Sequence, residues 1–185
     1  MSKIQIRTLF RTFFHIASVI LIMLALFSCK TNPENRPSPL VIENAQLDSI
    51  KIKLTYSSPA VRDRKIFGHG ADYLEQYEDL WRTGANKATT IHISNDIFVD
   101  TYKLDSGKYA IFTIPGEEKW TLIFNKNWEQ WGSYDYIDSL DVFRIDVPAM
   151  ELKEKEERMR LYINNDSLKF KWNLTTWGVP LSQFP

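Results

Sequence analysis

The chain has 185 residues, a formal net charge of zero, 44% hydrophobic residues and 25% charged residues. This length suits one domain with terminal extensions, and the composition excludes a chain that is disordered throughout. Because no surplus of basic residues is available to neutralise phosphates, the composition argues against nucleic acid as a partner.

The first 28 residues have the layout of a secretory signal peptide. Three basic residues, Lys3, Arg7 and Arg11, precede an apolar run over residues 16–27. The run is about a dozen residues long, whereas a membrane-spanning helix needs about 20. Three of the 23 basic residues would leave with this segment, so the mature chain would carry 20 basic against 23 acidic residues. Its net charge would be about −3.

The segment ends in Leu26-Phe27-Ser28-Cys29, which resembles the lipobox of bacterial lipoproteins. By that resemblance Cys29 becomes the lipidated first residue of the mature protein, and acyl chains then hold it on a membrane. Cys29 is also the only cysteine of the chain, so the folded part can form no disulfide. We expect a lipid-anchored protein of a diderm cell envelope, facing the periplasm or the cell surface. The alternative is an uncleaved N-terminal anchor.

A flexible tether is predicted to follow, over residues 29–46. It is polar and contains three prolines, so it cannot bury a core. A single β-sandwich domain is then expected over residues 47–185, because a chain of this length can bury a sufficient core without disulfides.

The domain begins with a two-residue alternation in which Ile50, Ile52 and Leu54 share one face and lysines occupy the other. This pattern is typical of a half-buried strand. Residues 71–80 are acidic and aromatic and are predicted to form a helical turn or two, and residues 127–136 to form an aromatic loop. Further short strands are predicted over residues 65–67, 89–94, 97–99, 102–104, 109–114, 120–124, 141–147, 160–163, 168–174 and 176–179.

Two turns predict hairpins: the Pro-Gly pair at 115–116, and the Asn-Asn-Asp turn at 164–166. The charged run 151–158 is expected to cross the surface. About nine short strands with regularly spaced turns and almost no helical periodicity predict an all-β fold. We therefore expect an antiparallel β-sandwich with little helix, of a jelly-roll, immunoglobulin-like or barrel-like kind.

Several blocks of the sequence recur in one order in a known bacterial family. They are Tyr56-Ser57-Ser58-Pro59-Ala60-Val61, Arg64-Lys65-Ile66-Phe67-Gly68, Trp81-Arg82-Thr83-Gly84-Ala85-Asn86, Phe112-Thr113-Ile114-Pro115-Gly116, Trp120-Thr121-Leu122-Ile123-Phe124-Asn125-Lys126 and Gln130-Trp131-Gly132. Together they resemble DUF2911, a domain of unknown function among exported proteins of Bacteroidetes-type bacteria, over about residues 47–180. The resemblance implies no activity. Two features depart from the family: the segment 68–80 is longer and lacks a proline, and Lys87 replaces a glutamate.

Aromatic and polar side chains gather in two loop regions and suggest a shallow ligand site. The candidate ligand-binding residues are Trp81, Arg82, Asn86, Gln130, Trp131 and Tyr134. Flat rings would stack on a ligand while the guanidinium and amides recognise its polar groups, which suits a glycan, a peptide or an acidic small molecule. The alternative is structural: Trp81 closes one end of the sandwich, Arg82 binds loop carbonyls, Gly84 adopts a positive φ and Asn86 caps the turn.

Catalytic and metal motifs are weak. The mature chain has two histidines, His69 and His92, and neither lies in a ligand-spaced motif, so no metal and no cofactor are predicted. No nucleophile elbow or phosphate-binding glycine loop is present. These patterns favour a ligand-binding or scaffolding protein over an enzyme. The alternatives are a hydrolase of the cell envelope, metal-assisted through His69 or His92, and a structural subunit of an envelope assembly.

Overall fold

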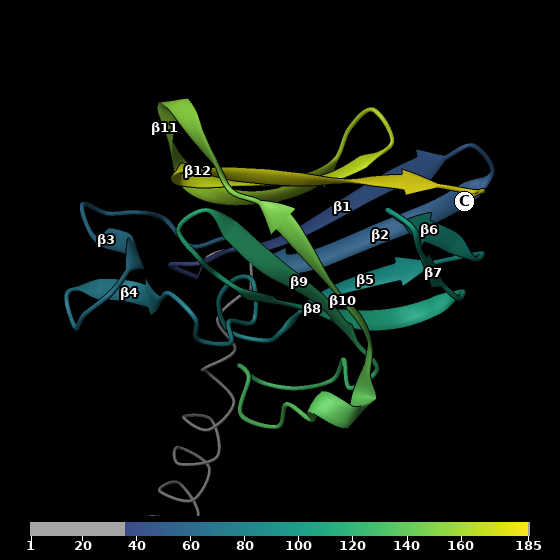
Figure 1. The fold of residues 1–185 in the computed structure, drawn as a ribbon, viewed down its shortest axis with the longest axis horizontal. Helices are drawn as coiled ribbons and strands as arrows, with labels where there is room; N and C mark the ends of the chain where they lie inside the picture. The colour runs from purple at the N-terminus through teal and green to yellow at the C-terminus, as the bar shows by residue number, and fades with distance from the viewer. Residues whose placement is uncertain (1–35, 185) are drawn as a thin grey trace, which may run out of the picture. The chain divides into compact units, whose positions relative to one another are not determined.

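Two antiparallel sheets face each other in the computed structural model, which describes residues 36–184 (Figure 1). The six-stranded sheet has the order β1 (Leu40–Leu47), β2 (Ile50–Ser57), β5 (Thr89–Ile93), β8 (Gly107–Ile114), β9 (Lys119–Asn125) and β10 (Asp141–Pro148). The four-stranded sheet has the order β11 (Met150–Ile163), β12 (Ser167–Ser182), β6 (Ile97–Val99) and β7 (Tyr102–Leu104). The expected antiparallel β-sandwich is confirmed, with one short 3-10 turn (Asp138–Leu140) among the described residues.

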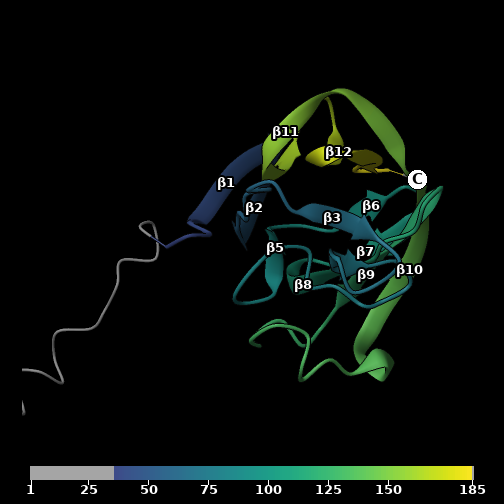
Figure 2. The same ribbon diagram turned by 90° about the vertical axis from the view of Figure 1, so that its left-hand side faces the viewer.

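The main core lies between the two sheets, with β11 and β12 on the far side of it from β5 and β8 (Figure 2). Its centre is aromatic: the Trp81 ring stacks on Trp172 at 5.8 Å between centroids, and Phe67 meets Trp120 edge-on at 4.7 Å. Burial of each such side chain contributes about 2 kcal/mol or more. The alternation predicted for β2 is confirmed, since Ile50, Ile52 and Leu54 are buried.

A second, smaller apolar cluster lies on the opposite, outer face of the six-stranded sheet. It consists of Ala88, Ala110, Phe112 and Ile123, with Trp128 and Tyr136 of the aromatic loop packed against it. The predicted aromatic loop, residues 127–136, therefore folds over part of this outer face. Next to it on the same face, Lys53 of β2 and His92 of β5 are exposed.

Asp141 at the start of β10 fastens the aromatic loop. The Tyr136 hydroxyl donates a hydrogen bond to Asp141 Oδ2 at 2.6 Å, and Asn125 Nδ2 donates to Asp141 Oδ1 at 2.7 Å. Arg144 Nε donates to the same carboxylate at 2.8 Å. Because bonds to an ionised acceptor are strong, this network fixes the loop that carries Trp128 and Trp131.

The expected boundary between tether and domain at residue 47 is wrong. Residues 40–47 form β1, which pairs with β2 in unbroken register from Leu40 opposite Ser57 to Leu47 opposite Ile50. β1 lies at the edge of the sheet and its side chains are largely exposed, so it lacks the apolar alternation of a half-buried strand. The predicted signal peptide, Cys29 and the first part of the tether lie outside the described residues.

Three further expectations change. Residues 71–80 form no helical turn, because β4 (Tyr73–Gln76) pairs in parallel with β3 (Lys65–Gly68). The charged run 151–158 is part of β11, an edge strand, where its side chains are exposed or half-buried. The segment 176–179 is the continuation of β12, a strand of 16 residues. Twelve strands therefore replace the expected nine among the described residues.

Both predicted hairpins are confirmed. β8 pairs with β9 from Ala110 opposite Asn125 to Ile114 opposite Thr121, and β11 pairs with β12 across the turn at 164–166. Within residues 36–184 no helix is both long and apolar enough to cross a membrane.

Candidate functional site

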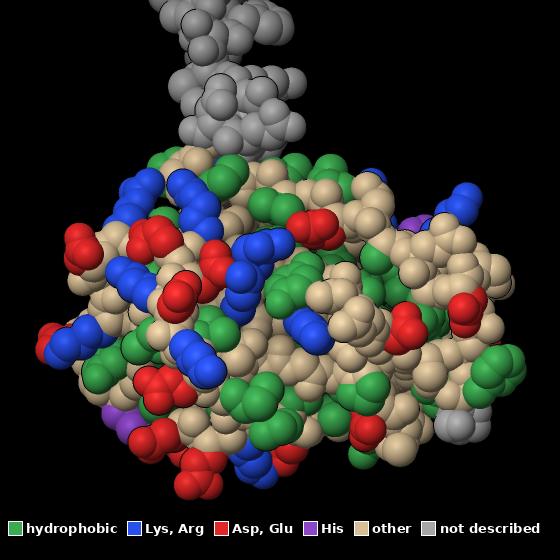
Figure 3. All heavy atoms as spheres, turned by 90° about the horizontal axis from the view of Figure 1, so that it is seen from above, with side chains coloured by type: hydrophobic (Ala, Val, Ile, Leu, Met, Phe, Trp, Pro, Cys, Tyr) green, Lys and Arg blue, Asp and Glu red, His purple; other side chains and the backbone are tan. Residues whose placement is uncertain are grey.

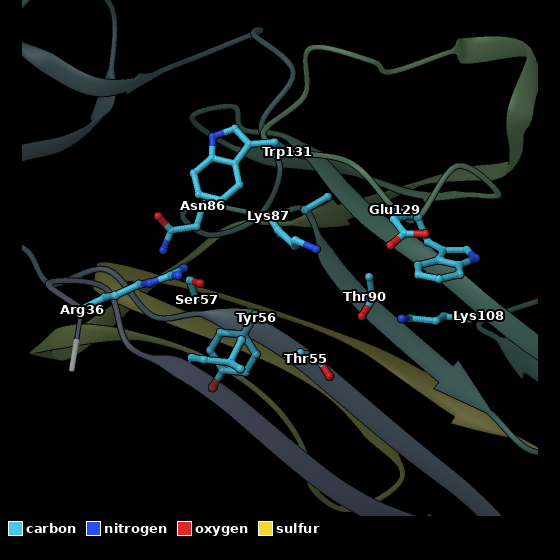
Figure 4. A pocket seen from close by; sticks show the side chains of 13 residues that line it. Arg36, Thr55, Tyr56, Ser57, Asn86, Lys87, Thr90, Lys108, Glu129 and Trp131 are labelled. Carbon is cyan, nitrogen blue, oxygen red and sulfur yellow. The ribbon is translucent and has the colours of Figure 1, made fainter. Parts of the chain in front are cut away.

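A pocket of about 420 Å³ opens beside the aromatic loop, on the outer side of β2, β5 and β8 (Figure 4). Its lining comes from the segment before β1, from the start of β1, from β2, from the turn at 85–88, from β5 and β8, and from the loop. The lining residues are Arg36, Leu40, Thr55, Tyr56, Ser57, Asn86, Lys87, Ala88, Thr90, Lys108, Trp128, Glu129 and Trp131. We call it the aromatic pocket.

A tight corner over residues 81–89 forms one wall of the aromatic pocket. Trp81 exchanges two backbone hydrogen bonds with Thr113 of β8, at 2.7 and 2.9 Å, and the Thr89 hydroxyl donates to the Thr83 carbonyl at 2.7 Å. A Cβ added to Gly84 would lie 3.0 Å from the Ser57 carbonyl oxygen, so the corner requires glycine there.

Two residues of the corner, Asn86 and Lys87, lie at the rim of the pocket. Asn86 adopts a left-handed backbone with φ of 63°, a conformation that asparagine tolerates. Its carbonyl accepts a hydrogen bond from Gly132 N at 2.9 Å, and Lys87 forms an isolated β-bridge with Trp131. The corner and the aromatic loop are thereby joined, and Figure 4 shows the Lys87 side chain between Trp131 and Glu129.

Two of the six predicted ligand residues, Asn86 and Trp131, line the pocket, and the Trp131 side chain is 52% exposed. Trp81 is buried in the main core, where its indole N–H donates to the Gly84 carbonyl at 3.1 Å. The structural alternative therefore holds for Trp81, and its prediction as a ligand residue is wrong.

The remaining three predicted residues also lie outside the pocket lining. Gln130 is buried, and its Nε2 donates to the Asn127 carbonyl at 2.6 Å, so it shapes the loop from within. Tyr134 is 86% exposed, and its ring lies beside Gly132 outside the pocket lining. Arg82 is half-buried, and its Nε has no hydrogen-bond partner among the described residues, contrary to the expected bond to a loop carbonyl.

Arg82 instead contributes its charge to Glu75 of β4. Burial raises the pKa of the Glu75 carboxyl to about 7, and the guanidinium groups of Arg82 and Arg64 oppose that shift. Glu75 does not line the aromatic pocket. We interpret Glu75 and Arg82 as part of the packing of the β3–β4 pair against the core.

Sequence reasoning missed most of the charge in the pocket. Arg36, Lys87 and Lys108 supply three cations, and Glu129 supplies one carboxylate. The sequence did not single out Lys108, because it looks like an ordinary outward-facing residue at the start of β8. The available signal was its alternation with the buried Tyr109, which places it on the outer face of the sheet.

Lys108 lies over the ring of Trp128, with 3.7 Å between its Nζ and the ring centroid. Desolvation lowers the pKa of Lys108, Lys53 and Lys87 lower it further, and Glu129 opposes the change. A cation under this repulsion is stabilised by an anionic ligand. The pocket can therefore hold a negatively charged group beside two indole rings.

Neither of the two histidines is among the residues that line the pocket. His69 packs edge-on against the Tyr77 ring at 5.3 Å between centroids, and His92 is exposed on the outer face of β5. Among residues 36–184 no cluster of three His, Cys, Asp or Glu side chains could hold a metal ion. Neither histidine therefore belongs to a metal-ligand set among these residues.

Comparison with known proteins gave one match. A family model described as "Protein of unknown function (DUF2911)" matches residues 38–181. The matched region begins before β1, in agreement with a domain that includes this strand. No curated protein and no solved structure matches the chain.

Proposed function

The chain belongs to the DUF2911 family, whose function is unknown, and since membership carries no activity we propose from its own surface that it is a cell-envelope lipoprotein that binds a small acidic ligand in the aromatic pocket. The observation that carries the proposal is the composition of this pocket. It combines the rings of Trp128 and Trp131 with three cations and a single carboxylate.

Indole rings and cations have complementary roles toward such a ligand. An exposed ring such as Trp131 offers an apolar plane for the face of a sugar or another flat group. Lys87 and Arg36 would pair with an acidic substituent, and Asn86 would hydrogen-bond a hydroxyl or carbonyl oxygen. An acidic sugar has all of these features, so we select it as the ligand class.

The structure around the pocket favours binding by a largely preformed site. The corner over residues 81–89 is fixed by backbone hydrogen bonds to β8, and the aromatic loop is fixed through Asp141. A site on such a rigid frame loses little conformational entropy when a ligand binds. The proposal also includes a lipid anchor that holds this domain in the cell envelope. The lipobox-like ending at Cys29 supports that part.

Isothermal titration of the full chain in detergent tests the ligand. The probes are galacturonic acid and N-acetylneuraminic acid, with uncharged galactose as the matched comparison. We expect at least one acid to bind, galactose to bind more weakly, and Trp131→Ala to weaken the binding of both sugars. Tyr134→Ala is the control, because it removes an exposed ring from the same loop outside the pocket. Equal binding of galactose, or full binding by Trp131→Ala, would overturn the proposal.

A further inference from the structure

The outer face of the six-stranded sheet carries a row of basic side chains that begins at the aromatic pocket. In the register of the sheet Lys53 of β2 lies opposite His92 of β5, and His92 lies opposite Lys108 of β8. Residues directly opposite each other point to the same face, with Cβ atoms about 5 Å apart. We call these three residues the basic row; it spans about 10 Å across three strands.

This arrangement carries an electrostatic cost that the surrounding face offsets only in part. Desolvation lowers the pKa of Lys108 and the charge of Lys53 lowers it further, since the two ammonium groups repel each other across the row. The row continues into Asn44 of β1, which lies opposite Lys53, and the flanking positions on the same face include Thr55 and Thr90. None of these three neighbours is a carboxylate; Glu129 offsets part of the repulsion at Lys108, and a bound anion would relieve the rest.

A second hollow lies at the other end of the basic row. It has a volume of about 500 Å³, and its polar lining residues are Asn44, Gln46, Lys51, Lys53, His92 and Ser94. Among residues 36–184, no acidic side chain lines it. Two lysines, a histidine and two amides thus face the same open space. We call it the amide hollow.

The basic row connects the amide hollow with the aromatic pocket. Lys53 and His92 line the hollow, while Lys108 lines the pocket. Thr55 and Thr90 also line the pocket and lie two residues along the same strands from Lys53 and His92, on the same face. The two concavities are therefore neighbours on one continuous face of the sheet.

The opposite side of the molecule shows what an ordinary surface of this protein looks like. Over β11 and β12 basic and acidic side chains are mixed (Figure 3). They pair there, as in the ion pairs of Lys171 with Glu156 and of Lys155 with Glu157. The single-sign charge of the basic row thus contrasts with the paired charges of the β11–β12 face.

We propose that the aromatic pocket, the basic row and the amide hollow form one extended binding surface for a linear oligosaccharide of acidic sugars. The inference rests on the proposed function, because it takes the aromatic pocket as the first subsite. One sugar occupies the pocket beside Trp131, its neighbour places a carboxylate on the basic row, and a third meets the amides of Asn44 and Gln46.

The chemistry of the face favours a glycan over a peptide or a nucleic acid. β2, β5 and β8 are interior strands whose backbone groups are used by their neighbours, so an extended peptide cannot add to the sheet here. Side-chain amides and ammonium groups suit hydroxyls and carboxylates instead. The basic row holds two lysines and one histidine, too few basic groups to neutralise a long polyphosphate backbone.

Titration of the full chain in detergent with galacturonic acid and its linear dimer, trimer and tetramer tests the proposal. We expect the affinity to rise by about tenfold or more from monomer to tetramer, because one added charge-assisted contact contributes about that factor. The double variant Lys53→Gln/His92→Ala is expected to lose this gain and keep the monomer affinity. Lys53→Arg with His92 intact should retain the gain, which separates lost charge from misfolding. Lys153→Gln, an exposed lysine on β11, is the control.

Each outcome decides a different claim. If the monomer binds and the affinity does not rise with the length of the oligomer, the extended surface is overturned and the aromatic pocket stands. Failure of every acidic probe would overturn the pocket and the extended surface together. A neutral oligomer, cellotetraose, that binds as tightly as the tetragalacturonate would refute recognition of the acid. Tighter binding of oligothymidylate would identify a nucleic acid as the ligand and overturn the glycan.

Discussion

The ammonium group of Lys108 lies 3.7 Å from the centre of the Trp128 ring. This contact joins the first residues of β8 to a loop that begins after β9, and it sets a cation at the junction of the aromatic pocket and the basic row. A cation over an indole face is stabilised by about 0.5–1 kcal/mol at an exposed site. Lys108 therefore holds the loop, and under the proposed function it would also present charge to a ligand.

Lys108→Met should separate these two roles. We expect a loss of stability of no more than about 1 kcal/mol, because the methionine still packs on Trp128. The affinity for an acidic ligand should fall by about tenfold, since an ionic contact is removed. Thermal unfolding and calorimetric titration measure the two effects. Lys126→Met, at an exposed lysine before the loop, is the matched control; equal losses of affinity in both variants would contradict a specific role for Lys108.

Glu75 should make the stability of the domain depend on pH. Its pKa in the folded protein is about 7, above the ordinary value of 4.5, so the folded state binds the proton more tightly than the unfolded state. The free energy of unfolding should therefore fall as pH rises from about 4.5 to 7, by up to about 3 kcal/mol. Urea unfolding at a series of pH values measures this change.

Substitutions at Glu75 and Glu78 test the assignment. Glu75→Gln cannot ionise and should remove the decline, which leaves the variant more stable than the wild type at pH 8. Glu78→Gln changes an exposed carboxylate nearby and should keep the wild-type profile. Arg82→Met should steepen the loss above pH 7, because it removes a charge that favours ionised Glu75. Identical pH profiles for the wild type and Glu75→Gln would exclude this explanation.

Asp141→Ala should loosen the aromatic loop. The substitution leaves the Tyr136 hydroxyl and the buried Asn125 amide without their shared acceptor. We expect a cost of about 2–4 kcal/mol in urea unfolding and a weaker ligand affinity, since Trp128 and Trp131 lose their support. Asp138→Ala, at an exposed neighbour, should change stability by less than about 0.5 kcal/mol. Unchanged stability of Asp141→Ala would show that the loop is held by packing alone.

Gly84→Ala should destabilise the corner at 81–89. The new Cβ would approach the Ser57 carbonyl oxygen to 3.0 Å and Thr89 Oγ1 to 3.1 Å. A backbone neighbour cannot move without shifting β2, so we expect a loss of about 1–3 kcal/mol. Gly178→Ala in β12 meets atoms no closer than 3.6 Å and serves as the control. Similar melting temperatures for the two variants would show that the corner yields more easily than its contacts suggest.

Cys29→Ser tests the anchor. The lipobox-like ending predicts that Cys29 carries the acyl chains, so the variant should lose palmitate labelling and move from the membrane fraction to the soluble fraction. Ser28→Ala, one residue earlier, should leave both unchanged. Persistent labelling of the Cys29→Ser chain would instead support an uncleaved N-terminal anchor.

Local patterns predicted the strands that bury one face and the tight hairpins. Ile50, Ile52 and Leu54 alternate with lysines, and such an alternation reports burial directly. β1 was not predicted, because an edge strand buries few side chains and so shows little apolar alternation. The β3–β4 pairing was not predicted, because parallel pairing of two short segments gives neither segment a periodic pattern.

The sequence by itself determined the family, the all-β class and the region from which the site would come, because these follow from local blocks and periodicities. It placed aromatic residues in the loop at 127–136, and two of them do line the pocket. Only the tertiary structure decided which residues share the site. Strand register sets Lys53, His92 and Lys108 side by side across positions far apart in the chain. Trp81 packs in the core, because an indole ring is more stable among Phe67, Trp120 and Trp172 than at a solvent-exposed surface.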